Sequence, residues 1–139
     1  QRLWADNVEK NPRSAVAWYA LGTARLEARA LPEAIHCFTE ALEQNPEYVV
    51  AYDNRGVAYY YTGRYQEAIR DFGNAIALKP DDADAYSNRA IADFAVQDYP
   101  RALSDVNAAQ RLGAHPPENF LRDLAAAAGR LNPAPSPPP

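Results

Sequence analysis

The side chains that could act as acids, nucleophiles or metal ligands are few in this chain. The two histidines, His36 and His115, are far apart in sequence, and Cys37 is the only thiol. No second cysteine or suitably spaced histidine completes a metal-binding set, so we expect no metal site and no cofactor. Cys37 is expected to be a partly buried small residue, and His36 a solvated surface histidine.

Carboxylates are more numerous, and several of them cluster. Asp53, Asp81, Asp82 and Asp84 include pairs that could in principle do acid and base chemistry. They fall at predicted helix starts, however, where carboxylates cap free N–H groups and meet a favourable helix dipole. The chain also has no glycine-rich phosphate loop. We therefore predict no catalytic residues and expect that the chain is not an enzyme.

Composition limits the partners. The chain has 139 residues, 47% of them hydrophobic, and a formal net charge of −4, and its only lysines are Lys10 and Lys79. A nucleic-acid partner is therefore not expected, since a phosphate-binding surface needs clustered cations. No apolar run is long enough to cross a bilayer, so a membrane association is expected only through missing parts of the chain. One reduced cysteine fits the cytoplasm and the periplasm equally, which leaves the localisation unknown.

The elements that must position these side chains recur along the sequence with a period of 34 residues. Large and small residues alternate at helical spacing within each period, as two closely packed helices require. The pattern predicts an all-α fold with helices near 15–29, 32–44, 49–62, 65–78, 83–96 and 100–111. Pro32 and Pro100 suit the first turn of a helix, Gly63 suits a left-handed cap, and Gly22 and Gly56 are predicted to be packing residues. The recurring positions include Trp18, Tyr52, Tyr86; Gly22, Gly56, Ala90; Ala34, Ala68, Ala102; Phe38, Phe72, Val106; and Pro46, Pro80.

The first unit reads Trp18-x2-Leu21-Gly22, then Ala34-x3-Phe38 and Pro46, and the second reads Tyr52-x2-Arg55-Gly56-x2-Tyr59, then Ala68-x3-Phe72 and Pro80. This pattern resembles the tetratricopeptide repeat (TPR) family. The resemblance implies a right-handed α-solenoid of antiparallel helix pairs, the TPR superhelix, with repeats at 15–48, 49–82 and 83–116. The third unit departs from the pattern, as terminal repeats usually do.

The flanking segments extend the same register. Trp4, Val8 and Pro12 predict that residues 1–12 are the second half of a truncated preceding repeat, so the chain is expected to be a fragment or a processed product. An apolar stripe over residues 117–131 predicts a capping helix that covers the open end of the stack. Residues 132–139 are proline-rich and are expected to form a polyproline-like tail that serves as a linker, with a ligand for a proline-reading domain as the alternative.

In the family that the chain resembles, the first helices of successive repeats line a concave groove. The resemblance implies aromatic residues along the groove and two amides one repeat apart, Asn54 and Asn88, that can clamp an extended peptide backbone. Arg55 and Arg89 are expected to pair with acids between units. The alternative is that Tyr60 and Phe94 only pack between helices and that the amides are solvated. The implied peptide-binding residues are Tyr19, Thr23, Asp53, Asn54, Val57, Tyr60, Tyr61, Asp84, Asn88, Ile91 and Phe94.

Family members that hold the C-terminal carboxylates of heat-shock chaperones carry lysine, arginine and asparagine at five groove positions. Only Asn54 matches here, while Tyr19, Thr23, Asp84 and Asn88 occupy the other four. Since Asp84 stands where a cation should be, a peptide carboxylate would be repelled. We therefore expect a neutral or basic protein segment as the partner, and not a chaperone tail.

The sequence thus predicts a non-catalytic scaffold for protein–protein interaction that binds an extended peptide or a helix in its concave groove. Two alternatives stay open. The first is an assembly element that self-associates through the N-terminal edge around Trp4 and Val8. The second is a docking appendage of a larger enzyme or membrane protein.

Overall fold

The computed structural model describes residues 14–131 of the chain. The predicted half repeat at 1–12 and the proline-rich tail at 132–139 lie outside this range. Within it the chain forms helices and no strands, and every predicted helix is found with ends that differ from the prediction by at most two residues. The helices are α2 (Ser14–Glu27), α3 (Leu31–Gln44), α4 (Val49–Tyr61), α5 (Tyr65–Leu78), α6 (Ala83–Ala95), α7 (Tyr99–Arg111) and α8 (Glu118–Leu131).

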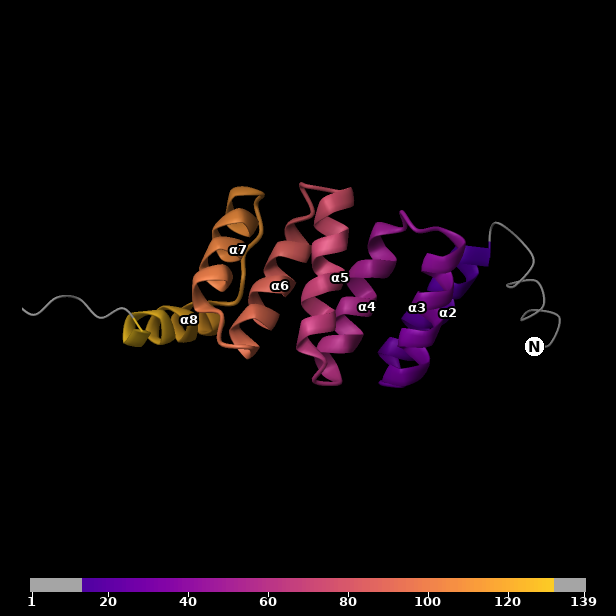
Figure 1. Cartoon of the computed structure of the whole chain (residues 1–139), viewed down its shortest axis with the longest axis horizontal. Helices are drawn as coiled ribbons and strands as arrows, with labels where there is room; N and C mark the ends of the chain where they lie inside the picture. Colours follow the sequence, from indigo (N-terminus) through magenta and orange to yellow (C-terminus); the bar gives the residue numbers. More distant parts are fainter. Residues whose placement is uncertain (1–13, 132–139) are drawn as a thin grey trace, which may run out of the picture.

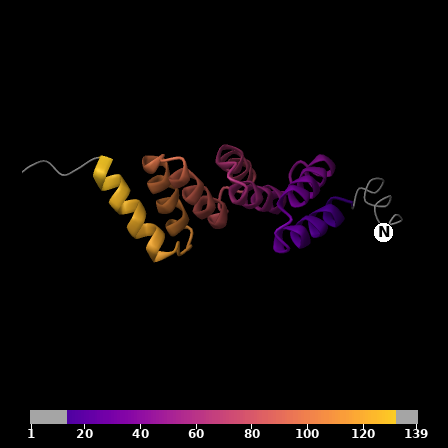
Figure 2. The ribbon, with the colours of Figure 1, turned by 90° about the horizontal axis from the view of Figure 1, so that it is seen from below.

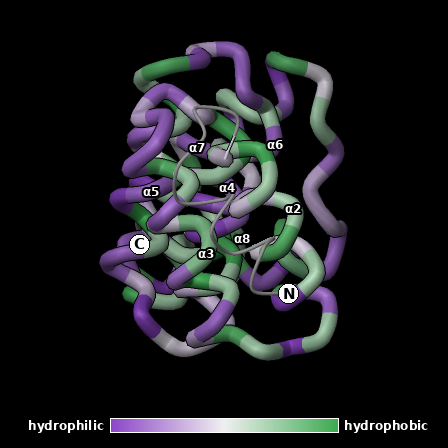
Figure 3. The backbone as a smooth tube through the Cα atoms, turned by 90° about the vertical axis from the view of Figure 1, so that its right-hand side faces the viewer, coloured by the Kyte–Doolittle hydropathy of each residue, from purple (hydrophilic) through white to green (hydrophobic). Residues whose placement is uncertain are grey.

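Each helix packs against its neighbour in sequence, so the molecule is an elongated stack that runs from α2 to α8 (Figures 1 and 2). The first helices of successive units also contact one another, α2 with α4 and α4 with α6, more than successive second helices do. They therefore form an inner row. Hydrophobic and hydrophilic stretches alternate along the chain, as amphipathic helices require (Figure 3). The fold is the all-α helical-repeat solenoid that the sequence predicts.

The turns between the two helices of a unit repeat one backbone conformation. Arg29, Gly63 and Gln97 stand 34 residues apart, and each has a positive φ, of 61°, 79° and 65°. This left-handed conformation ends the first helix, as predicted for Gly63. The second helix then begins with Pro32 in α3 and Pro100 in α7, because the first turn of a helix tolerates a missing N–H.

The two helices of a unit approach closely at one glycine. A Cβ atom on Gly22 would lie 2.6 Å from Cε1 of Phe38, and one on Gly56 would lie 2.6 Å from Cε1 of Phe72. Both phenylalanines are buried, so these glycines are packing residues, as predicted. In the third unit the same positions hold a larger and a smaller residue, Ala90 and Val106, which lie in one buried cluster.

Candidate functional site: a hollow on the inner row of helices

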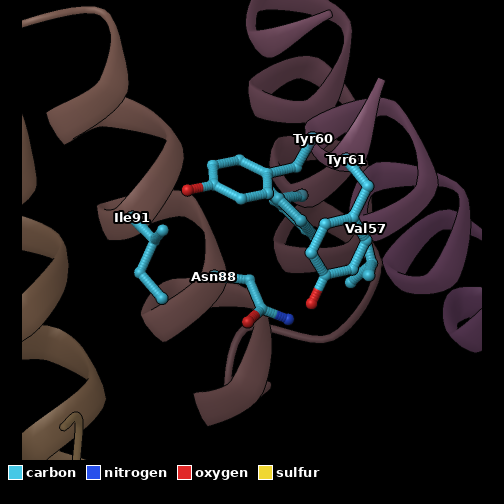
Figure 4. Close-up of a pocket in the computed structure, with 6 residues that line it drawn as sticks. Val57, Tyr60, Tyr61, Asn88 and Ile91 are labelled. Atoms are coloured by element: carbon cyan, nitrogen blue, oxygen red, sulfur yellow. The ribbon is translucent and has the colours of Figure 1, made fainter. Parts of the chain in front are cut away.

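A hollow of about 80 Å³ opens between α4 and α6 on the inner row. Its apolar walls come from one turn of each helix, because positions three or four apart share a helix face. In Figure 4 the ring of Tyr60 points toward Ile91, and the hydroxyl of Tyr61 points toward the side-chain amide of Asn88. The hollow thus combines an apolar interior with polar atoms at its edge. It is lined by Val57, Tyr60, Tyr61, Phe72, Asn88 and Ile91.

The other residues that the sequence places in the groove do not reach this hollow. On the N-terminal side, the Asn54 Nδ2 atom donates a hydrogen bond of 2.9 Å to the Tyr19 hydroxyl, so this amide ties α4 to α2. The Thr23 hydroxyl donates to the Tyr19 carbonyl at 3.0 Å, within its own helix. Tyr19 itself stacks on Tyr48, with ring centroids 5.1 Å apart. Asn88, one period after Asn54, makes no side-chain hydrogen bond within residues 14–131.

Phe94 lies at the other end of the row, against the capping helix. Its ring centroid is 5.6 Å from that of Phe120 in α8 and 5.4 Å from that of Tyr99 in α7. Phe94 is therefore part of the contact between the third unit and α8. Tyr60 has a double role, because it stacks on Tyr65 at 5.3 Å and also lines the hollow.

The acidic residues at the junction of α4, α5 and α6 influence one another. Burial, a hydrogen bond with Asp82 and the nearby charge of Asp84 raise the pKa of Asp53 to about 8. The Asp82 carboxylate caps α6 by accepting a bond of 3.1 Å from the Ala85 N–H, as expected for a helix start. The same expectation is wrong for Asp53, since α4 begins at Val49 and Asp53 lies in its second turn, against Asp82.

Two buried ion pairs cross the helix pairs of the second and third units. Arg55 Nε lies 2.7 Å from Asp71 Oδ2, and Arg89 NH2 lies 2.7 Å from Asp105 Oδ1. The expectation that Arg55 and Arg89 pair with acids of neighbouring units is wrong, because both acids belong to the same unit as their arginine. Only one contact crosses units, a hydrogen bond of 3.1 Å from Arg55 NH1 to the Thr39 hydroxyl.

Sequence reasoning missed two residues near the hollow. Phe72 forms part of its lining, although its register position marked it as a core residue. Arg29 places its guanidinium carbon 4.5 Å from the centroid of the Tyr61 ring. No motif signals Arg29, since it comes from the turn after α2, one unit earlier in the chain.

The remaining reactive side chains offer no chemistry of their own. Cys37 is buried, and burial raises the pKa of its thiol. His36 is exposed and packs edge-on against the Trp18 ring, with centroids 5.7 Å apart. Among residues 14–131 no group of three or more histidines, cysteines and acidic residues is placed to hold a metal ion. Within the same range, none of the helices has the length and apolarity needed to cross a membrane.

Solved structures of other proteins share this architecture. The first TPR domain of the human RPAP3 protein superposes with a TM-score of 0.81 at 28% identity, over 89% of this chain and 100% of that one. The first TPR of Spaghetti (RPAP3), bound to the HSP90 peptide SRMEEVD, gives 0.79 at 25% identity, over 88% and 97%. The TPR2B domain of yeast Sti1, in a complex described as pHsp70, gives 0.70 at 28% identity, over 81% and 91%.

Family models agree with the structural comparison. A comparison with curated proteins gives no match. A TPR repeat model matches residues 58–97, and two tetratricopeptide repeat models match residues 15–48 and 37–70. The three matches together span residues 15–97, in the register of the 34-residue period. The chain belongs to the tetratricopeptide repeat family.

Proposed function

We propose that the chain is a non-catalytic interaction module that binds an extended peptide or a helix along the inner row formed by α2, α4 and α6. The observation that carries this proposal is the hollow between α4 and α6. It is apolar inside, and the Tyr61 hydroxyl and the Asn88 amide lie at its edge. An apolar side chain of the partner would fill the interior, and the amide would bond the partner's backbone. Structurally similar TPR domains that bind chaperone peptides support a peptide as the partner.

The charge of the inner row favours a neutral or basic segment. Asp84 is exposed in the first turn of α6, and Asp53 and Asp82 are its acidic neighbours. No lysine or arginine stands at the positions that hold chaperone carboxylates in the family members described above. A peptide with an acidic C-terminus would therefore gain no charge-assisted hydrogen bond and would be repelled by Asp84. This argument separates the proposed partner from the HSP90 peptide that the first TPR of Spaghetti binds.

The experiment is a selection of peptides from a random library on the full chain, followed by calorimetric titration of the selected peptides. We expect them to be neutral or basic and to carry an apolar anchor residue. The acidic peptide SRMEEVD is the comparison probe and should bind at least about tenfold more weakly, a difference of about 1.4 kcal/mol. Tight binding of SRMEEVD would refute the charge argument.

Two variants locate the binding site. Asn88→Ala should weaken binding of a selected peptide about fivefold, since one hydrogen bond contributes roughly 1 kcal/mol, and should leave the melting temperature unchanged. The matched control is Asn74→Ala, which removes an exposed amide from α5. Equal affinities for the two variants would place binding elsewhere. Asn54→Ala is less suitable as a test, because it also removes the bond to Tyr19.

A further inference from the structure

A second hollow lies at the C-terminal end of the stack, away from the inner row. Its volume is about 250 Å³, and its lining is formed by the start of α7 and the end of α8. Leu103 is 39% exposed and Leu131 is 67% exposed, so both present apolar surface to solvent. No charged residue belongs to the lining. The lining residues are Tyr99, Pro100, Leu103, Ala128 and Leu131.

The repeat register explains why this surface is uncovered. Leu103 stands 34 residues after Ile69, which is only 8% exposed because Ala92 and Val96 of α6 pack over it. The residue 34 positions after Val96 is Arg130, a charged side chain that does not replace the valine. In addition, α8 lies across the direction of α7 and contacts it less than α6 contacts α5 (Figure 1). The last unit therefore keeps an apolar surface that an inner unit would cover with its next helix.

We propose that the proline-rich segment 132–139 of this chain folds back and covers this hollow. The segment follows Leu131, which is itself part of the lining, and it contains five prolines, one alanine and no charged residue. Proline has no backbone N–H, so its burial leaves no donor without a partner. Aromatic and aliphatic surfaces such as those of Tyr99, Pro100 and Leu103 are the kind of surface on which proline-rich segments dock.

Reach and affinity permit this arrangement. Eight residues in a polyproline conformation extend over roughly 25 Å, at about 3.1 Å per residue, which exceeds the width of a hollow of this volume. A tethered segment has an effective concentration of about 1 mM, so contacts that are weak between separate molecules suffice here. The proposal is independent of peptide binding along α2, α4 and α6, because the two hollows share no residue.

The test compares the full chain with a variant in which Pro133, Pro135, Pro137, Pro138 and Pro139 are replaced by glycine. Leu103 methyl groups are observed by NMR with a soluble paramagnetic probe. A segment that docks with a dissociation constant of about 1 mM would cover the hollow about half of the time, so relaxation of the Leu103 methyls should be about twofold faster in the variant. In the full chain, nuclear Overhauser contacts should connect proline ring protons to Leu103 and Tyr99.

The matched control is Leu78, an apolar residue of α5 that is 41% exposed and takes no part in this hollow. Its relaxation should be the same in both chains. Equal relaxation of Leu103 in both chains, without contacts to proline protons, would overturn the proposal. Protection of Leu103 that grows with protein concentration in both chains would also overturn it and would assign the hollow to a second copy of the chain.

Discussion

Arg55 and Asp71 are joined by two parallel hydrogen bonds, from Nε at 2.7 Å and from NH2 at 2.8 Å, across the helix pair of the second unit. Arg89 and Asp105 repeat this geometry one period later. The same positions of the first unit hold Leu21 and Cys37. One site in the helix pair is therefore filled by a buried ion pair in two units and by two apolar side chains in the other. The relationship explains how Asp71 can be buried at an exposed fraction of 2%.

The first prediction concerns the removal of one partner. Asp71→Asn should lower the free energy of unfolding by about 3 kcal/mol, because a buried guanidinium loses its counter-charge. The double variant Arg55→Leu with Asp71→Cys copies the first unit and should lose much less, since replacement of a whole buried ion pair by apolar residues is often neutral. Urea unfolding of both variants measures the difference. A double variant that is as unstable as Asp71→Asn would show that the second unit depends on the charges themselves.

The second prediction concerns the close approach of Gly56 to Phe72. Gly56→Ala should destabilise the fold by about 1–3 kcal/mol, because a Cβ would lie 2.6 Å from the Phe72 ring, and Gly56→Leu should cost more. The third unit combines Ala90 with Val106, so Phe72→Val should make room for Gly56→Ala. In a double-mutant cycle the two changes should therefore cost less together than the sum of the single costs, by about 0.5–3 kcal/mol. Strict additivity in the unfolding measurements would contradict this packing argument.

The third prediction concerns the left-handed turn residue of the third unit. Gln97 has a φ of 65°, a conformation that favours glycine, and the equivalent residue of the second unit is Gly63. Gln97→Gly should therefore stabilise the chain by about 1 kcal/mol, which a thermal melt would show as a higher midpoint. Gly63→Gln is the reverse change and should cost a similar amount. Arg29 is a poorer test site, because it also packs on the Tyr61 ring.

Much of the fold could be predicted because it follows from a period. Gly22, Pro32 and Gly63 each solve a local problem, namely close approach, helix start and helix end, and the solutions recur in register. Repetition therefore gives helix bounds without knowledge of any tertiary contact. The groove residues are harder to predict, because a period does not state which neighbour a side chain meets. Phe94 illustrates this, since its neighbour is Phe120 of a capping helix and not another first helix of a repeat.

The electrostatic pairs were beyond the sequence argument for a related reason. Arg55 and Asp71 are 16 residues apart, the same separation as Gly56 and Phe72, so both pairs meet across one helix pair. The paired substitution of Arg and Asp for Leu21 and Cys37 was the signal that could have revealed this contact. Asp53 gave no such signal, because its neighbour Asp82 reads as an ordinary helix cap.

The fourth prediction concerns Asp93, a carboxyl group with no exposed surface whose two oxygens accept no hydrogen bond among the described residues. Burial and the neighbouring Asp105 carboxylate raise its pKa to about 8, against the weaker opposing effects of Arg101, 3.8 Å away, and Arg89. In the unfolded chain an aspartate has a pKa of about 3.9. The folded chain therefore keeps a proton on Asp93 that the unfolded chain releases between about pH 4 and pH 8.

The sign follows from this difference. The contribution of Asp93 to stability is complete below about pH 4 and is lost as the pH rises toward about 8. Asp93→Asn is uncharged at every pH, so its stability relative to the unmodified chain should increase by about 1 kcal/mol or more between about pH 5 and pH 9. Urea unfolding at both pH values measures the change, with the exposed Asp123→Asn as the control that should show none. A constant difference between Asp93→Asn and the unmodified chain would mean that Asp93 is ionised in the fold, with Arg101 as its partner. Asp53 titrates in the same range, and so some pH dependence should persist in Asp93→Asn and fall further when Asp53→Asn is added.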